Sequence, residues 1–148
     1  IQKDKIYFFD SMSEDLKAEC NRINLAVQQQ GGIDLALVGI GMNGHIGFNE
    51  PGVDLALSAH VVELDEVTTT VGQKYFTSGT ALAKGITLGM AQIMAAREVV
   101  LIASGEKKAA IIRKAIQEKI ADTIPASLIT AHPHASILLD VVAAALLD

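Results

Sequence analysis

The 148-residue sequence predicts an α/β fold, a three-layer α/β/α domain built on a mostly parallel sheet. Short apolar runs alternate along the chain with amphipathic helical segments. Two of these runs, residues 33–38 and 98–103, contain almost no polar residues. Continuous apolar strands are typical of parallel sheets covered on both faces. No internal repeat, low-complexity tract or Pro/Ser-rich linker interrupts this pattern, so we expect a single domain over residues 1–148.

The first elements follow from local signals. Lys5–Phe9 has the composition of a short strand. Ser11-Met12-Ser13-Glu14 is a capping-box sequence, which predicts a helix start. Apolar residues then recur between Leu16 and Val27 at spacings of 4, 3 and 4, which predicts one helix face ending near Gly31-Gly32.

The middle of the chain contains a buried strand and a long loop. Residues 33–38 predict a strand buried on both faces, and residues 39–52 a loop. His60–Asp65 is predicted as a strand. Residues 66–76 stay open between helix and strand, because three consecutive threonines favour strand while their flanks allow helix.

Six further elements are predicted downstream: a helix at Leu88–Ala96, a buried strand at Glu98–Ala103, a helix at Glu106–Ile120, a short helix opened by Pro125, a strand at Ser136–Leu139 and a terminal helix at Val141–Leu147. Ligands bind at the carboxyl ends of the strands in such sheets. The loops after Val38 and Ala103 are therefore the places to search for a site.

The composition excludes several classes of protein. Seventeen acidic residues against twelve basic ones give a net charge of −5, which argues against binding to nucleic acid or an anionic membrane. No apolar run reaches the roughly 18 residues of a membrane-spanning helix. Cys20 is the single cysteine, so no internal disulfide or thiolate cluster is possible. The first residues lack the pattern of a signal peptide, and we expect a cytoplasmic protein.

The loop after Val38 carries a glycine pattern with two interpretations. Gly39-Ile40-Gly41-Met42-Asn43-Gly44 matches the G-x-G-x-x-G spacing of dinucleotide-binding loops. Such a site needs a helix packed on the sheet directly afterwards, whereas Gly47 and Pro51-Gly52 break any helix within two turns. We therefore disfavour a dinucleotide site.

The same loop holds three closely spaced polar side chains among small residues: His45, Asn49 and Glu50. Long loops without their own secondary structure are usually functional or mobile. The alternative is that His45 and Glu50 only cap neighbouring elements. A metal site is disfavoured because no third ligand lies at a useful local spacing.

The run Gly39–Gly52, with its histidine, its Phe-Asn-Glu-Pro segment and its glycines, closely resembles the signature loop of the glucosamine-6-phosphate deaminase/isomerase family, which includes galactosamine-6-phosphate isomerases. The similarity continues through Gly85-Ile86-Thr87 and Gly105–Ala109 to Asp140. It implies the glucosamine-6-phosphate deaminase / ribose-5-phosphate isomerase / CoA-transferase-like fold. It also implies that the chain is the C-terminal portion of a longer domain, whose upstream part carries a phosphate loop and an aspartate that moves the C2 proton.

The resemblance implies a reaction and a histidine that starts it. The family opens a cyclic amino-hexose 6-phosphate, shifts a proton from C2 to C1, and releases ammonia to leave a ketose 6-phosphate. By resemblance, His45 catalyses ring opening, a task suited to a group that titrates near neutrality. Glu50 matches the carboxylate that completes the relay with this imidazole. No metal or organic cofactor is expected.

Other site residues follow from the same alignment. Asn43 stands where the family often has aspartate, which predicts a less basic His45; its alternative is a turn residue in the left-handed conformation. Lys107 and Lys108 begin a predicted helix, a placement that makes sense if an anion binds there, and Lys108 matches the family's phosphate lysine. Lys74 matches a position that is commonly a phosphate-binding arginine.

The loop glycines Gly41 and Gly44 are expected to let the backbone approach the substrate closely. Two rival functions stay open: a non-catalytic sugar-phosphate-binding domain, and a 6-phosphogluconolactonase-like hydrolase, whose family loop lacks the Phe-Asn-Glu-Pro segment. The expected partner is a small sugar phosphate, with glucosamine or galactosamine 6-phosphate undecided. A homo-oligomer is possible.

Overall fold

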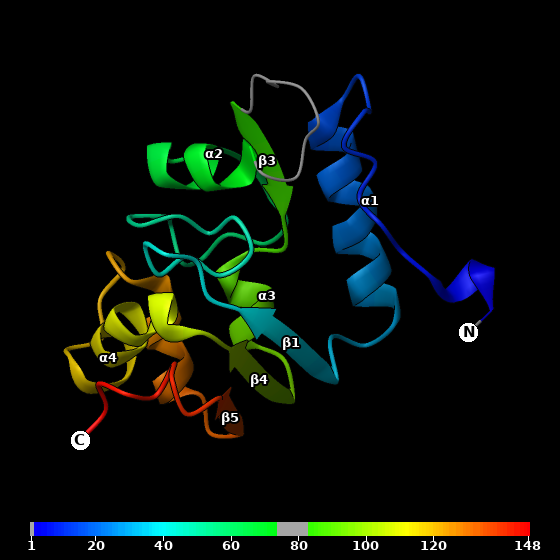
Figure 1. Cartoon of the computed structure of the whole chain (residues 1–148). Coiled ribbons are helices and arrows are strands. Elements are labelled where there is room, and N and C mark those ends of the chain that lie inside the picture. Colours follow the sequence, from blue (N-terminus) through cyan, green and yellow to red (C-terminus); the bar gives the residue numbers. More distant parts are fainter. Residues whose placement is uncertain (1, 74–82) are drawn as a thin grey trace.

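The structure is a computed structural model that describes residues 2–73 and 83–148 (Figure 1). Its elements in chain order are η1 (Lys3–Lys5), α1 (Leu16–Gln29), β1 (Leu35–Gly39), β2 (His60–Glu63), α2 (Glu66–Gly72), β3 (Lys84–Thr87), α3 (Met90–Met94), β4 (Glu98–Ala103), η3 (Glu106–Lys108), α4 (Ala109–Gln117), η4 (Pro125–Ala131) and β5 (Ala135–Leu139). Among the described residues, no helix is long and apolar enough to cross a bilayer.

Three strands form the parallel sheet that the sequence predicts. Their order is β1-β4-β5, with Leu35 opposite Glu98 and Val99 opposite Ala135. Strands β2 and β3 form a separate antiparallel pair, in which His60 faces Thr87. The α/β class and the parallel sheet are therefore confirmed, whereas the sequence pattern did not identify β3 as a strand.

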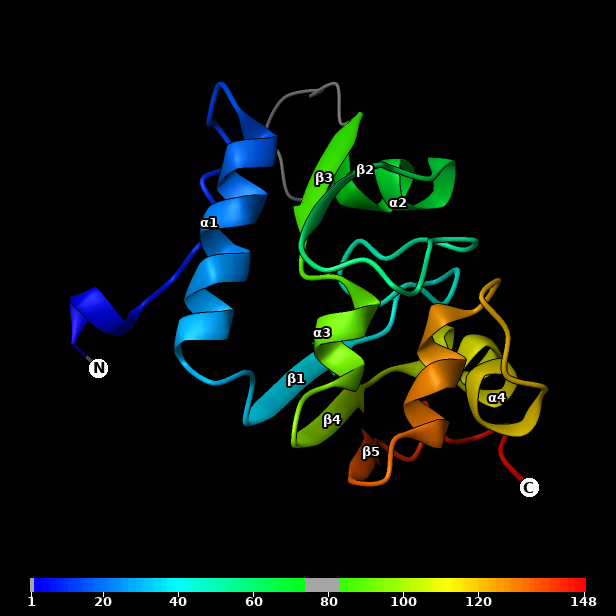
Figure 2. The same cartoon turned by 180° about the vertical axis from the view of Figure 1, so that it is seen from behind.

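One face of the parallel sheet carries the main core. Val99 and Leu101 of β4 are fully buried against α3, α4 and η4, as are Met90, Ile112 and Ile129 from those helices. The view from behind shows α3, α4 and η4 gathered beside the three strands (Figure 2). Val38 and Ile40, at the carboxyl end of β1, pack in this core, and the candidate loop leaves the sheet there.

The opposite face of the same sheet is open. Leu35 and Leu37 of β1 are 54% and 64% exposed, and Ile102 of β4 and Leu138 of β5 are 44% and 55% exposed. The expectation that residues 33–38 are buried on both faces is therefore wrong for the described residues. The expectation of a fully buried strand at residues 98–103 is wrong at Glu98 and Ile102, which lie on this same open face and are exposed.

Helix α1 packs on the antiparallel pair. Cys20 and Ile23 are buried there with Val61 and Ile86, so Cys20 is a core residue. The helix begins two residues after the predicted capping box, because the Asp15 carboxylate accepts the Ala18 N–H at 2.9 Å.

Two predicted elements are wrong. Residues 6–9 have no regular secondary structure and pair with no described strand, and Arg22 of α1 donates instead to the Phe8 carbonyl at 2.7 Å. Residues 141–146 form consecutive turns, not an α-helix, because the N–H groups of Ala145 and Leu147 donate to carbonyls three residues back, those of Val142 and Ala144. The predicted Glu106–Ile120 helix divides into η3 and α4 and ends at Gln117.

Candidate active site

The site is built on the loop that follows β1. The Gly41 N–H donates to the His45 carbonyl at 2.9 Å, and the Gly44 N–H donates to the Gly41 carbonyl at 3.1 Å, so the loop closes in tight turns. Fully buried Ile46 anchors it in the core, and the Asn49 side chain donates to the carbonyl of Ile46 at 2.8 Å. No helix follows the glycines, which agrees with disfavouring a dinucleotide site.

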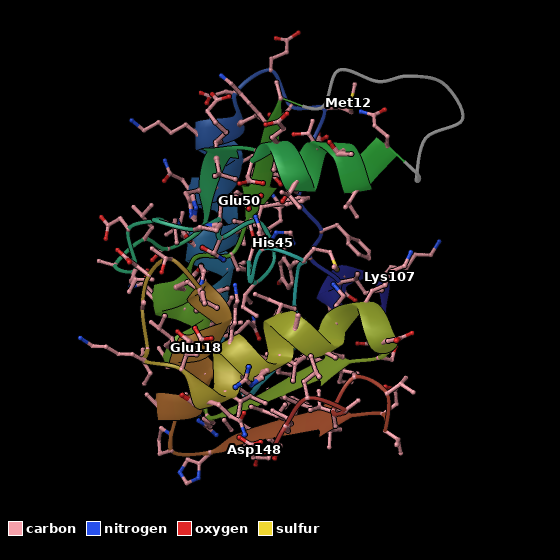
Figure 3. The ribbon with its side chains drawn as sticks, turned by 60° about the vertical axis from the view of Figure 1, so that its left-hand side comes forward. Met12, His45, Glu50, Lys107, Glu118 and Asp148 are labelled. Atoms are coloured by element: carbon pink, nitrogen blue, oxygen red, sulfur yellow. The ribbon has the colours of Figure 1, made fainter. Side chains whose placement is uncertain are left out.

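His45 and Glu50 come together as predicted. His45 Nδ1 lies 3.4 Å from Glu50 Oε2, with side-chain exposures of 19% and 8% (Figure 3). Burial lowers the pKa of the His45 imidazole below its usual value of about 6.5, while Glu50 opposes that shift. Burial therefore favours the neutral ring, which can take up a proton with a carboxylate beside it.

Asn43 holds this pair from the side. Its Nδ2 donates to Glu50 Oε2 at 2.8 Å, and its Oδ1 accepts the backbone N–H of His45 at 3.2 Å. The amide therefore orients the carboxylate and the loop backbone, and it does not contact the imidazole ring. No described residue other than glycine has a positive φ, so the alternative of a left-handed turn residue at Asn43 is wrong.

Gly41 and Gly44 have packing roles that composition did not predict. A Cβ on Gly41 would lie 2.3 to 2.5 Å from three atoms of the His45 ring, so the imidazole rests directly on the Gly41 backbone. Gly44 has φ +89°, and a Cβ there would meet Ile124 Cγ2 at 2.8 Å. Both glycines therefore make room for neighbouring side chains.

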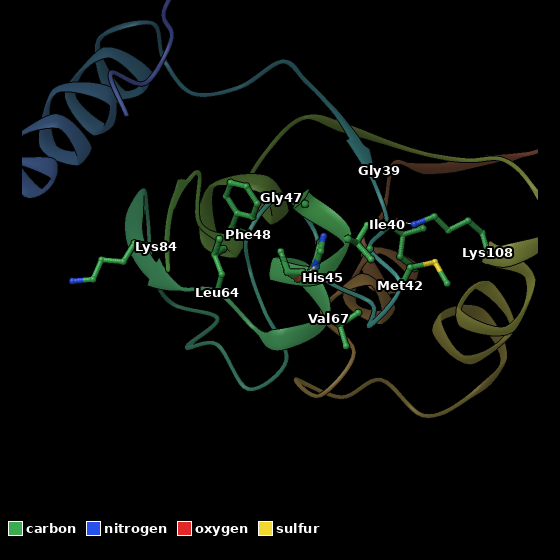
Figure 4. Close-up of a pocket in the computed structure, with 14 residues that line it drawn as sticks. Gly39, Ile40, Met42, His45, Gly47, Phe48, Leu64, Val67, Lys84 and Lys108 are labelled. Carbon is green, nitrogen blue, oxygen red and sulfur yellow. Dashed lines mark hydrogen bonds between the residues drawn. The ribbon is translucent and has the colours of Figure 1, made fainter. Parts of the chain in front are cut away.

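A cavity of about 570 Å³ opens beside His45 (Figure 4). It lies between the loop, α2 and β3, and its wall is mostly apolar. Its lining residues include Ile40, Met42, Phe48, Leu64, Val67 and Val71. The polar groups on the wall are His45, Thr68, Lys84 and Lys108. Few polar groups on an apolar wall are typical of small-molecule sites.

The lysines divide between the rim and the surface. Lys108 Nζ donates to the Ile40 carbonyl at 2.5 Å, which places its ammonium at the cavity beside the loop. Lys107 is exposed. Lys84 ends away from His45 and forms a 3.4 Å ion pair with Glu63 (Figure 4). Lys74, the other predicted phosphate ligand, lies outside the described residues.

Thr68 is the site residue that sequence reasoning missed. It belongs to α2, it is 8% exposed, and its Oγ1 lies 3.0 Å from His45 Nδ1. In the sequence, the three threonines at 68–70 showed only that this segment could be helix or strand. The contact of Thr68 with a residue 23 positions away leaves no local pattern that could predict it. In residues 2–73 and 83–148, no three His, Cys, Asp or Glu side chains gather as metal ligands.

Comparison with known sequences finds relatives along nearly the whole chain. The family model for glucosamine-6-phosphate isomerases/6-phosphogluconolactonase matches residues 1–138. A glucosamine-6-phosphate deaminase from Thermoanaerobacter pseudethanolicus is 38% identical over 99% of this chain. Another from Bacillus velezensis is 40% identical over 94% of it. The chain spans 58% of the length of each relative.

Solved structures of related proteins also superpose on this chain. A monomeric glucosamine-6-phosphate deaminase superposes with a TM-score of 0.93 at 36% identity, covering 98% of this chain and 61% of that one. The 6-phosphogluconolactonase of Trypanosoma brucei superposes with a TM-score of 0.69 at 22% identity, covering all of this chain and 63% of that one, a similarity of fold alone.

Proposed function

Because this chain belongs to the glucosamine-6-phosphate isomerase/6-phosphogluconolactonase family, we propose that it supplies the ring-opening part of an amino-sugar-phosphate deaminase. The substrate is glucosamine 6-phosphate, and the products are a ketose 6-phosphate and ammonia. The observation that carries the proposal is the His45–Glu50 pair, 3.4 Å apart on the wall of an apolar cavity.

His45 performs the first step. Opening the hexose ring removes the proton from O1 and adds one to O5, and a neutral imidazole can accept the first proton and then donate it. Burial of His45 favours the neutral ring, and Glu50 stabilises the imidazolium that forms between the two transfers. Asn43 keeps the carboxylate in place through its 2.8 Å hydrogen bond.

Lys108 binds the phosphate. Its ammonium has three N–H donors, so it can hold a phosphate oxygen while it still donates to the Ile40 carbonyl. The 6-phosphate then lies at the mouth of the loop, while C1 and O5 of the sugar point toward His45. Lys74 is the second expected phosphate ligand.

The second step needs a part of the domain beyond this chain. Moving the C2 proton to C1 requires another base, after which water displaces the nitrogen as ammonia. We place that base in an upstream segment that packs on the open face of β1-β4-β5, which bears Leu35 and Leu37. Buried Asn49 Oδ1 and Glu50 Oε1 lack a hydrogen-bond donor among the described residues, and we expect that segment or the substrate to supply one.

Binding of the upstream segment is testable by co-purification. The upstream part of the Thermoanaerobacter pseudethanolicus deaminase, co-expressed with a tagged form of this chain, should co-purify with it. Leu37→Lys should abolish the complex, because it places a charge on the open sheet face. Met12→Lys is the matched control, since Met12 is 87% exposed at the far end of the molecule, before α1 (Figure 3). Equal capture by both variants would contradict docking at this face.

Activity is measured on the assembled protein. Ammonia and ketose 6-phosphate should appear in equal amounts from glucosamine 6-phosphate, and His45→Asn should lower the rate at least about 100-fold, as expected for loss of a general acid–base group. His134→Asn, the same change at an exposed histidine outside the cavity, should leave the rate unchanged. Sugar-phosphate binding without turnover would favour the non-catalytic alternative.

The C4 epimer is decided by the same assay. The relatives named above are glucosamine-6-phosphate deaminases, which supports the gluco epimer for this chain. Galactosamine 6-phosphate differs only at C4, and the ratio of kcat/KM for the two sugars assigns the substrate. A ratio that favours galactosamine 6-phosphate would overturn the assignment.

A further inference from the structure

Thr68 reaches the imidazole from a different element of the fold. The N-cap Asp65 begins α2, and its carboxylate accepts the N–H groups of Val67 and Thr68 at 2.7 and 3.4 Å. This cap fixes the first turn of α2 above the loop. The Thr68 side chain then points into the cavity wall, where its Oγ1 lies 3.0 Å from His45 Nδ1.

The two oxygens near His45 Nδ1 differ in distance and in chemistry. Thr68 Oγ1, at 3.0 Å, is within normal hydrogen-bond range, whereas Glu50 Oε2, at 3.4 Å, is beyond the preferred range. A carboxylate only accepts, so it favours the tautomer in which Nδ1 carries the proton. The Thr68 hydroxyl then accepts from the same N–H, and it continues to accept when the ring becomes cationic.

The rest of the ring is placed by this contact. The imidazole lies on Gly41, where a Cβ would approach Nε2 to 2.4 Å, and no described residue forms a hydrogen bond with Nε2. A ring held at Nδ1 therefore leaves Nε2 as the nitrogen that meets a ligand in the cavity.

We propose that Thr68 is a positioning residue, whose hydroxyl holds Nδ1–H of His45 together with Glu50 and keeps Nε2 free as the base. The proposal rests on the ring-opening role given to His45 above. Two neighbouring threonines show that the role is specific to this position. The Thr69 hydroxyl donates to the Asp65 carbonyl at 2.6 Å, and Thr70 is exposed.

The test compares isosteric variants on the 148-residue chain. Thr68→Val keeps the shape of the side chain and removes its hydroxyl, Thr68→Ser restores a hydroxyl, and Thr70→Val makes the same change at an exposed site of the same helix. Two-dimensional NMR of ring ¹⁵N, recorded against pH, reports the tautomer and the pKa of His45. Thermal unfolding is followed in parallel, so that loss of structure is recognised separately.

Thr68→Val should lower the pKa of His45 by roughly half a pH unit and should reduce the population protonated at Nδ1, because a buried cation loses an acceptor. The other charged groups that act on the ring, Glu50, Asp65 and Lys108, are unchanged in every variant. Thr68→Ser and Thr70→Val should both match the parent chain. An unchanged or raised pKa in a folded Thr68→Val variant would overturn the proposal.

The failure of this inference is distinguishable from failure of the proposed function. If Thr68→Val leaves the ring unaltered while His45→Asn abolishes ammonia release in the assembled enzyme, Thr68 has no positioning role and the function stands. If ammonia release persists in His45→Asn, the function fails whatever the NMR spectra of Thr68→Val show.

Discussion

Replacing Glu50 with glutamine isolates the effect of one charge on the His45 imidazole. Glutamine has nearly the same shape, and its carbonyl oxygen can still accept the Asn43 amide hydrogen bond, which measures 2.8 Å in the parent. The loop should therefore keep its geometry. What the variant loses is a negative charge 3.4 Å from His45 Nδ1.

The size of the effect follows from that distance. Two unit charges 3.4 Å apart attract by about 1.2 kcal/mol in water and by about 5 kcal/mol at an effective dielectric constant of about 20. The smaller energy corresponds to about 0.9 pH unit. His45 is mostly buried, so Glu50→Gln should lower the pKa of its imidazole by at least about one pH unit, further below the ordinary value.

The assay is a pH titration of the ring C–H signals by NMR. The chain has four histidines, and the spectrum of His45→Asn assigns the signal of interest. Glu118→Gln is the matched control, because it removes one exposed carboxylate outside the cavity. A Glu50→Gln variant that remains folded but shows the parent pKa at His45 would refute the electrostatic pairing of these two residues.

Three further predictions concern the loop, the first helix and the core. Gly41→Ala should displace the His45 ring and lower the activity of the assembled enzyme more than Gly39→Ala does, since a Cβ on Gly39 meets no atom closer than 3.9 Å; steady-state kinetics of both variants decide this. Glu19 has its pKa lowered to about 2 by the adjacent arginine, so its carboxylate stabilises the fold above pH 4.5, and that stability disappears as the pH falls toward 2. The free energy of unfolding of Glu19→Gln, measured by denaturation, should accordingly be lower than that of the parent at pH 7 and should converge with it near pH 2. A difference in this free energy that does not depend on pH would contradict the assignment. Ile112→Ala should cost about 2–5 kcal/mol in urea unfolding, because Ile112 is fully buried, and a cost below about 1 kcal/mol would contradict its place in the core.

The loop residues of the site were predictable because their signal is local. His45 and Glu50 lie five positions apart in a run of glycines, and the turns that join them are encoded in that run. The position of β4 was equally clear, since five consecutive apolar residues, 99–103, follow Glu98.

Features set by distant contacts were not predictable. Thr68 contacts a residue 23 positions away, and β3 exists because it pairs with β2. The apolar residues 141–147 suggested a helix, yet the N–H groups of Ala145 and Leu147 donate to carbonyls three residues back, and the segment becomes a series of turns. Exposure of Leu37 depends on what packs on the sheet, which periodicity does not reveal.

The most direct test of the account is ammonia release from glucosamine 6-phosphate by the assembled protein, with His45→Asn compared against His134→Asn. We predict that the parent and His134→Asn release ammonia at equal rates, while His45→Asn loses at least about 100-fold. Release by His45→Asn at the parental rate would contradict the assignment of ring opening to this imidazole.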